Sequence, residues 1–160
     1  LGDLSRLTPA AKAAVDRVVA QTAGNTKLTL NLFISYGSRA ELTRAAKLIA
    51  EDVAAGRLKP EDVDEAAVSA RLYTEGCPDP DLLIRTSGER RISNFMLWQL
   101  AYTELYFTDT LWPDFDARTY LTAIHSYRKR ERRFGRTSEQ LTQEPQELPA
   151  ERSVVPIVGG

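Results

Sequence analysis

Two arginines and a serine that could bind phosphate follow a short apolar run at residues 82–84. Arg85 ends the run, Arg91 lies six residues later, and Ser93 precedes a segment with many apolar residues. Because ligands of an open α/β sheet bind beyond the carboxyl ends of its strands, these three side chains could converge on one anion. Helix N-termini and guanidinium groups both suit phosphate oxygens. The spacing therefore predicts a diphosphate site.

The elements that must position this site are short. Residues 82–84 and 105–107 are each predicted to form a buried strand. We expect a deeply packed helix over residues 94–102, with Ser93 as its N-cap. Strict alternation of apolar residues predicts a further strand at residues 27–35.

Four other helices are predicted from capping residues at their starts. One of these starts is interpreted as a capping box, formed by Ser38 and Glu41. The last helix is expected to turn Tyr120, Leu121, Ile124 and Tyr127 inward. The predicted helices run from Thr8 to Gly24, from Ser38 to Gly56, from Asp64 to Leu72, and from Asp116 into the basic residues 128–136.

The composition is that of an ordinary folded domain. The 160 residues are 42% hydrophobic and 27% charged, with a net charge of −1. Such a chain can bury about two-thirds of its unfolded surface, and its balanced charge argues against nucleic-acid binding. The single cysteine, Cys77, excludes an internal disulfide and gives no metal-ligand pattern. No apolar run approaches the roughly 18 residues of a membrane span, so we expect a cytoplasmic protein.

Two other groups of residues have a structural interpretation that we prefer. The acidic side chains between residues 51 and 65 lack the spacing of a metal-binding loop and are interpreted as a solvated face. His125 lies on the polar side of the last predicted helix and is interpreted as a solvated or hydrogen-bonded histidine rather than a catalytic one.

The segment from residue 85 onward resembles the cis-prenyltransferases of the undecaprenyl diphosphate synthase type. The resemblance covers roughly residues 1–135, which look like the C-terminal part of that family, and residues 136–160 are predicted to be a disordered tail. It implies an α/β fold, a parallel sheet flanked by helices, that is incomplete because the family's N-terminal strands are not in the sequence. The motifs that carry it are Tyr-Gly-Ser-Arg-Ala-Glu at 36–41, Arg-Thr-Ser-Gly-Glu at 85–89, Arg-Ile-Ser-Asn-Phe at 91–95, Trp-Gln-Leu-Ala-Tyr at 98–102, Glu-Leu-Tyr-Phe at 104–107, Trp-Pro-Asp-Phe at 112–115 and Arg-Glu-Arg-Arg-Phe-Gly at 130–135.

The resemblance also implies roles for individual residues. Arg85, Arg91 and Ser93 would hold the diphosphate of isopentenyl diphosphate, with Ile92 in the same substrate-binding set. Arg133 and Gly135 would reach across a homodimer interface into the partner's site. Glu104 would contribute to Mg²⁺ binding, for which a carboxylate oxygen is a suitable ligand. At the level of single residues an alternative stays open, in which Arg85 only pairs with Glu89 or Glu104 and Ser93 only caps a helix.

The activity implied is the condensation of isopentenyl diphosphate with an allylic prenyl diphosphate to a cis-polyprenyl diphosphate, a lipid carrier precursor. The family's Asp-Gly-Asn-Gly-Arg-Trp loop, with its essential aspartate, is not among these 160 residues, so no catalytic residue is identified. Since residue 1 is Leu and the single methionine is Met96, we expect a fragment that is inactive alone. The alternative is a non-catalytic partner subunit of a heteromeric enzyme. Membrane contact through the lipid product stays open.

Overall fold

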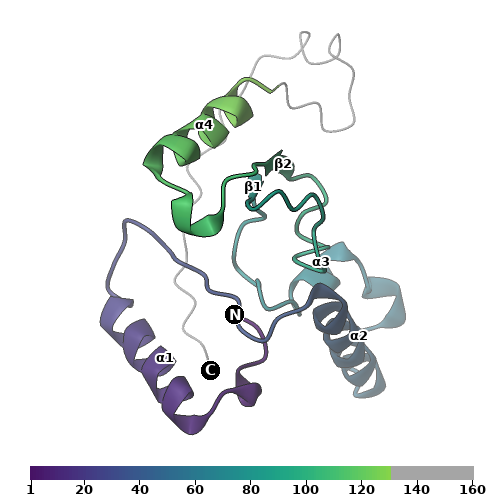
Figure 1. Ribbon diagram of the computed structural model, residues 1–160. Helices are drawn as coiled ribbons and strands as arrows, with labels where there is room; N and C mark the ends of the chain where they lie inside the picture. Colours follow the sequence, from purple (N-terminus) through teal and green to yellow (C-terminus); the bar gives the residue numbers. More distant parts are fainter. Residues whose placement is uncertain (131–160) are drawn as a thin grey trace, which may run out of the picture. The chain divides into compact units, whose positions relative to one another are not determined.

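The computed structural model describes residues 1–130, which form two compact units (Figure 1). The first unit contains Leu1–Pro78 and Asn94–Met96, and the second contains Asp79–Ser93 and the described residues from Leu97 onward. Within residues 1–130, no helix combines the length and apolar character that a membrane span requires. The predicted tail at 136–160 lies outside the described residues.

The first unit is mainly helical. Its 3-10 turns are η1 (Leu4–Arg6) and η2 (Pro60–Asp62), and its helices are α1 (Pro9–Thr22), α2 (Ser38–Ala54) and α3 (Glu65–Ser69). The predicted start of α1 is confirmed, because Thr8 Oγ1 accepts a hydrogen bond from Ala11 N at 3.3 Å. Asp64 caps α3 as predicted, but that helix ends at Ser69, before the predicted Leu72.

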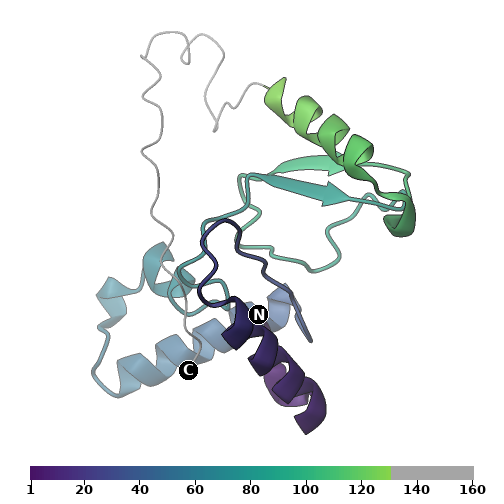
Figure 2. The ribbon, with the colours of Figure 1, turned by 90° about the vertical axis from the view of Figure 1, so that its left-hand side faces the viewer.

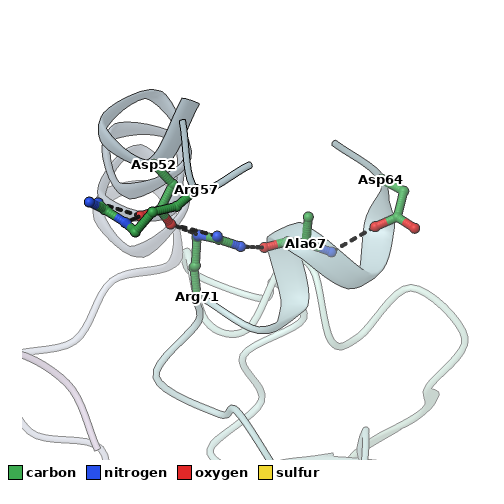
Figure 3. A network of polar contacts seen from close by, with 5 residues as sticks. All are labelled: Asp52, Arg57, Asp64, Ala67 and Arg71. Carbon is green, nitrogen blue, oxygen red and sulfur yellow. Dashed lines mark hydrogen bonds and ion pairs between the residues drawn. The ribbon is translucent and has the colours of Figure 1, made fainter. Parts of the chain in front are cut away.

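A polar network joins the end of α2 to α3 (Figure 3). Arg71 donates from Nη2 to Asp52 Oδ2 at 2.6 Å and from Nη1 to the Ala67 carbonyl at 2.7 Å. Arg57 donates to Asp52 Oδ1 at 2.7 Å, while Asp64 Oδ1 accepts from Ala67 N at 2.8 Å. Asp52 belongs to the acidic residues that were interpreted as a solvated face. It instead joins the end of α2 to α3, because Arg57 and Arg71 both lie within hydrogen-bonding distance of its carboxylate.

The second unit is built on two parallel strands, β1 (Leu82–Arg85) and β2 (Glu104–Phe107). In their register Leu82 lies beside Glu104 and Arg85 beside Phe107. Both strands are confirmed, although their residues are half-buried rather than buried and Phe107 is exposed. The strands lie side by side with α4 (Ala117–Arg128) along them, and α4 contacts β2 (Figure 2). This is the predicted α/β class with a parallel sheet.

Helix α4 begins as predicted, but only half of its predicted inner face is turned inward. Asp116 Oδ1 accepts from Thr119 N at 2.8 Å, so the cap is confirmed. Ala123 is fully buried and the predicted Ile124 and Tyr127 are partly buried, whereas Tyr120 and Leu121 are 49% and 55% exposed. A small residue lets a helix approach a strand closely, which explains why the inner face is centred on Ala123. The 3-10 turn η3 (Trp112–Asp114) precedes this helix.

The strand predicted at residues 27–35 is not formed. Leu28, Leu30 and Leu32 are 80%, 74% and 61% exposed, and the segment is irregular. A strand needs a neighbour to complete its ladder of hydrogen bonds, and the sheet of the described residues contains β1 and β2 alone. The alternating leucines of this segment therefore stay exposed, and no strand among residues 1–130 pairs with it.

The helix predicted over residues 94–102 is also wrong, as is the capping role of Ser93. Ser93, Asn94 and Met96 have φ values of +54°, +61° and +48°. An α-helix requires φ near −63° in successive residues, so the chain forms a series of turns here. Met96 and Leu100 are nevertheless buried, as their apolar character predicts.

The capping box at the start of α2 is wrong as well. Gly37 is the N-cap residue and makes no side-chain capping bond, and Ser38 is the first helical residue and is fully buried. The first backbone N–H groups are instead satisfied from a distant part of the sequence. Ser38 N donates to the Asn94 carbonyl at 2.8 Å, and Arg39 N donates to Asn94 Oδ1 at 2.9 Å.

Candidate functional site

The loop after β1, residues 86–93, carries most of the predicted phosphate-binding side chains. Its first half is fixed to the segment that follows β2. Thr108 N donates to the Arg85 carbonyl at 3.0 Å, Gly88 N to the Thr108 carbonyl at 3.0 Å, and Ser87 N to the Thr110 carbonyl at 2.8 Å. These backbone bonds continue the pairing of the strands beyond their ends, so the start of the loop is held rigidly at the carboxyl edge of the sheet.

The turn inside this loop requires a glycine. Ser87 and Gly88 have φ values of +65° and +69°, a left-handed conformation that glycine adopts without strain. A Cβ atom at position 88 would also lie 3.3 Å from Asp109 Oδ1. The Ser-Gly pair therefore allows the loop to turn tightly against residues 108–110.

Arg85 lies at the end of β1 with a polar atom that has no partner. Its side chain is partly buried, and its Nε atom is buried without a hydrogen bond to any described residue. Within the same residues, Glu89 pairs with Arg91 and Glu104 with Arg130, so neither carboxylate forms an ion pair with Arg85. A buried donor without a partner costs about 1–3 kcal/mol, and an oxyanion at this position would remove that cost.

Arg91, Ile92 and Ser93 occupy the second half of the loop. The Arg91 side chain is 72% exposed, and its Nη2 atom lies 2.6 Å from Glu89 Oε2. The two groups are close enough for an ion pair, but the contact is not aligned as a hydrogen bond. Ile92 is partly buried and Ser93 is exposed. The structure places these residues on one loop with Arg85, and their convergence on a single anion stays a prediction.

Glu104 lies at the amino end of β2, level with Leu82 rather than with Arg85. Three residues of strand separate these levels, which is about 10 Å along the sheet at roughly 3.3 Å per residue. Arg130 Nη1 donates to Glu104 Oε2 at 2.7 Å and to the Leu105 carbonyl at 2.8 Å. Sequence reasoning missed this pair, because nothing local connects residue 104 to residue 130.

Metal binding by Glu104 also stays a prediction. A carboxylate oxygen is a suitable ligand for Mg²⁺, but the described part of the chain contains no group of three His, Cys, Asp or Glu side chains that could hold a metal ion. Arg133 and Gly135 lie outside the described residues.

A second contact that the sequence did not predict involves Asn94, the residue after Ser93. Its carbonyl and side-chain oxygen cap α2, as described above. The available signal was the Arg-Ile-Ser-Asn-Phe motif itself, since asparagine tolerates positive φ and is a good helix cap. The distance of 55 residues between Asn94 and Arg39 concealed the partner.

Comparison with known proteins gives a consistent result. The family model described as "Putative undecaprenyl diphosphate synthase" matches residues 1–135. An isoprenyl transferase of Porphyromonas gingivalis is 55% identical over 141 residues, which are 88% of this chain and 56% of that protein. A ditrans,polycis-undecaprenyl-diphosphate synthase ((2E,6E)-farnesyl-diphosphate specific) of Xanthomonas axonopodis pv. citri is 52% identical over 141 residues, 88% of this chain and 55% of that protein. The chain thus spans about half the length of these relatives.

Solved structures show the same relationship. Lavandulyl diphosphate synthase from Lavandula x intermedia, in complex with dimethylallyl diphosphate, matches with a TM-score of 0.82 and 44% identity over 84% of this chain and 58% of that chain. A "probable undecaprenyl diphosphate synthase" from Campylobacter jejuni matches with a TM-score of 0.72 and 38% identity, over 85% and 61% of the two chains. From its sequence motifs, its parallel strand pair and these matches, the chain belongs to the undecaprenyl diphosphate synthase family of cis-prenyltransferases.

Proposed function

We propose that the natural full-length polypeptide carrying this chain is a cis-prenyltransferase. It joins isopentenyl diphosphate to an allylic prenyl diphosphate, forming a carbon–carbon bond while pyrophosphate leaves the allylic carbon and a proton is lost. Family membership supports this class of reaction. The observation that carries the proposal for this chain is the buried Nε–H of Arg85, which has no partner among residues 1–130 and lies where a parallel sheet binds its ligand.

Arg85, Arg91 and Ser93 would hold the diphosphate of isopentenyl diphosphate, with Ile92 lying between them on the loop. Arginine is permanently charged and can bind phosphate oxygens through two parallel hydrogen bonds. The ion pair of Arg91 with Glu89 does not prevent this, because an exposed pair is worth about 0–1 kcal/mol. A hydrogen bond to a charged group contributes about 1.5–3 kcal/mol, so a diphosphate would displace the glutamate.

Mg²⁺ would be the cofactor of this reaction. In proteins this ion is bound by one or two carboxylates together with substrate phosphates and waters, and Glu104 would supply one carboxylate oxygen. The bound ion would neutralise part of the diphosphate charge. Arg130 already donates to this carboxylate, so it must share or release Glu104 when the ion binds.

The residues proposed for homodimer contacts lie outside the described residues 1–130. Arg133 and Gly135 would reach the site of a second copy in a homodimer. We expect the enzyme to act in the cytoplasm and to contact the membrane through its lipid product.

The test measures binding of isopentenyl diphosphate to the natural full-length polypeptide by calorimetry. Replacing Arg85 or Arg91 by alanine should weaken binding by roughly one to two orders of magnitude, because each change removes a charge-assisted hydrogen bond. Arg57→Ala is the matched control: it removes the same charge from an exposed arginine that is also paired with a carboxylate. Its affinity should equal that of the parent protein.

Two outcomes would contradict the proposal in different ways. Equal affinity of the parent, Arg85→Ala and Arg91→Ala would remove the assigned diphosphate site. Normal binding without formation of a longer prenyl diphosphate, in an assay with an allylic diphosphate and Mg²⁺, would instead favour a non-catalytic partner subunit.

A further inference from the structure

The segment Asn94–Met96 belongs to the first unit and directly follows the loop that carries the proposed diphosphate site. Asn94 meets the start of α2 twice: its carbonyl accepts from Ser38 N at 2.8 Å, and its Oδ1 atom accepts from Arg39 N at 2.9 Å. Both donors are among the first N–H groups of a helix, which have no acceptor within the helix itself. Asn94 thus performs the capping role that an N-cap side chain usually performs locally.

The two following residues are fixed to the same place. The Phe95 ring packs edge-on against Phe33 and Tyr36, with centroid distances of 5.0 and 5.7 Å. Met96 is buried, and the Tyr36 hydroxyl donates to Glu41 Oε2 at 2.6 Å. Backbone, side-chain and ring contacts therefore all act on a segment of three residues.

The residue types at both sides of this contact are specific. Gly37 lies so close to Asn94 that a Cβ atom at position 37 would be 2.9 Å from Asn94 Nδ2. Asn94 itself has a φ of +61°, a conformation that asparagine and glycine adopt more readily than other residues. A larger residue at position 37 would force the Asn94 amide to turn, and its bond to Arg39 N would be lost.

We propose that this contact, which we call the Asn94 clasp (Gly37–Arg39 with Asn94–Met96), positions the end of the diphosphate-binding loop. Asn94 is then a positioning residue for the prenyl-transfer site. Ser93 is joined to Asn94 by a peptide bond. Fixing the Asn94 carbonyl and side chain therefore restricts the backbone conformations available to the end of the loop, which carries Ser93 and Arg91. Without the clasp, the loop must be ordered when the diphosphate binds, and affinity falls. This inference rests on the proposed function.

The experiment is a double-variant cycle in the natural full-length polypeptide, with isopentenyl diphosphate as the titrant. Asn94→Gly keeps the positive φ and removes the hydrogen bond from Arg39 N to the Asn94 side chain, and it should weaken binding by about two- to tenfold, the effect of losing one hydrogen bond. Gly37→Ala displaces the Asn94 amide and should also weaken binding. In the double variant there is no amide to displace, so the affinity should be no lower than that of Asn94→Gly alone.

A matched control separates positioning from general stability. Thr8→Ala removes the side-chain cap of α1, a comparable hydrogen bond in the same unit, and should lower the thermal midpoint without changing affinity. All titrations are made at a temperature where circular dichroism shows each variant to be folded. Gly37→Ala, the milder change, provides the affinity test if Asn94→Gly does not fold.

The possible results distinguish this inference from the proposed function. Parent-like affinity in Asn94→Gly, or in Gly37→Ala when that variant provides the test, would overturn the clasp and leave the proposed function standing. Losses that multiply in the double variant would overturn the coupling between positions 37 and 94. A parent protein that does not bind isopentenyl diphosphate would overturn the proposed function and this inference with it.

Discussion

The strongest stability effect is expected from the buried carboxylate of Glu41 in the first turn of α2. This residue is 0% exposed. Its Oε1 atom accepts from Tyr73 N at 2.9 Å, and its Oε2 atom accepts from the Tyr36 hydroxyl at 2.6 Å. Replacing Glu41 by alanine would remove the acceptor of both donors in a part of the unit that water does not reach.

The magnitude follows from these two bonds. Hydrogen bonds to a charged group contribute about 1.5–3 kcal/mol each, so Glu41→Ala should lower the free energy of unfolding by about 3–6 kcal/mol. That is a large share of the roughly 5–15 kcal/mol that stabilises a typical protein. Glu41→Gln should cost about 1–2 kcal/mol, because its amide oxygen can still accept from Tyr73 N and its amide nitrogen can donate to the Tyr36 oxygen.

The assay is urea denaturation followed by tryptophan fluorescence. Glu51→Ala, which removes an exposed carboxylate from the same helix, serves as the control and should change the free energy of unfolding by no more than about 0.5 kcal/mol. If Glu41→Ala cost as little as the control, the assigned role of the Glu41 carboxylate in joining α2 to Tyr36 and Tyr73 would be refuted.

Three further predictions concern charged groups. Hydrogen bonds, first from Arg71, lower the pKa of Asp52 below its ordinary 3.8; the stability it contributes is therefore present above that pH and is lost as the pH falls through the lower, folded value. Arg71→Ala should reduce this acid dependence in urea denaturation. Burial, first among the causes, raises the pKa of Tyr36 from 10.0 to about 12; its contribution is complete below pH 10.0 and is lost as the pH rises through about 12. Tyr36→Phe should remove that alkaline loss. Arg130→Ala should tighten Mg²⁺ binding in the presence of isopentenyl diphosphate, since it removes the cation that competes for Glu104, and an unchanged calorimetric affinity would argue against Glu104 as a ligand.

Part of the site could be predicted from sequence because its signals are local. Arg85 follows an apolar run of strand length, and the structure confirms that it ends β1. Thr8 and Asp116 each accept a hydrogen bond from a backbone N–H three residues later, so the starts of α1 and α4 were readable from short segments. The order of Arg91, Ile92 and Ser93 on one loop follows from their spacing alone.

The remaining features could not be read in this way because their partners are remote. An apolar pattern at residues 27–35 predicts a strand, but a strand forms only where a neighbour completes its hydrogen bonds. The positive φ values of Ser93, Asn94 and Met96 replace a predicted helix with turns, since the contacts of Asn94–Met96 with residues 33–39 outweigh local helix propensity.

The sequence by itself determined the family, the two strands and the capped starts of α1, α3 and α4, and it named the charged residues that we propose for a diphosphate. Only the tertiary structure decided how those charges are engaged. It paired Glu104 with Arg130 and Glu89 with Arg91, left the Arg85 Nε without a partner in the described region, and assigned Asn94 to cap α2. The physical reason is the separation of the interacting residues along the sequence. A local cap or a strand pattern involves residues only a few positions apart. An ion pair or a remote cap instead depends on which distant segments the fold brings within about 3 Å of each other.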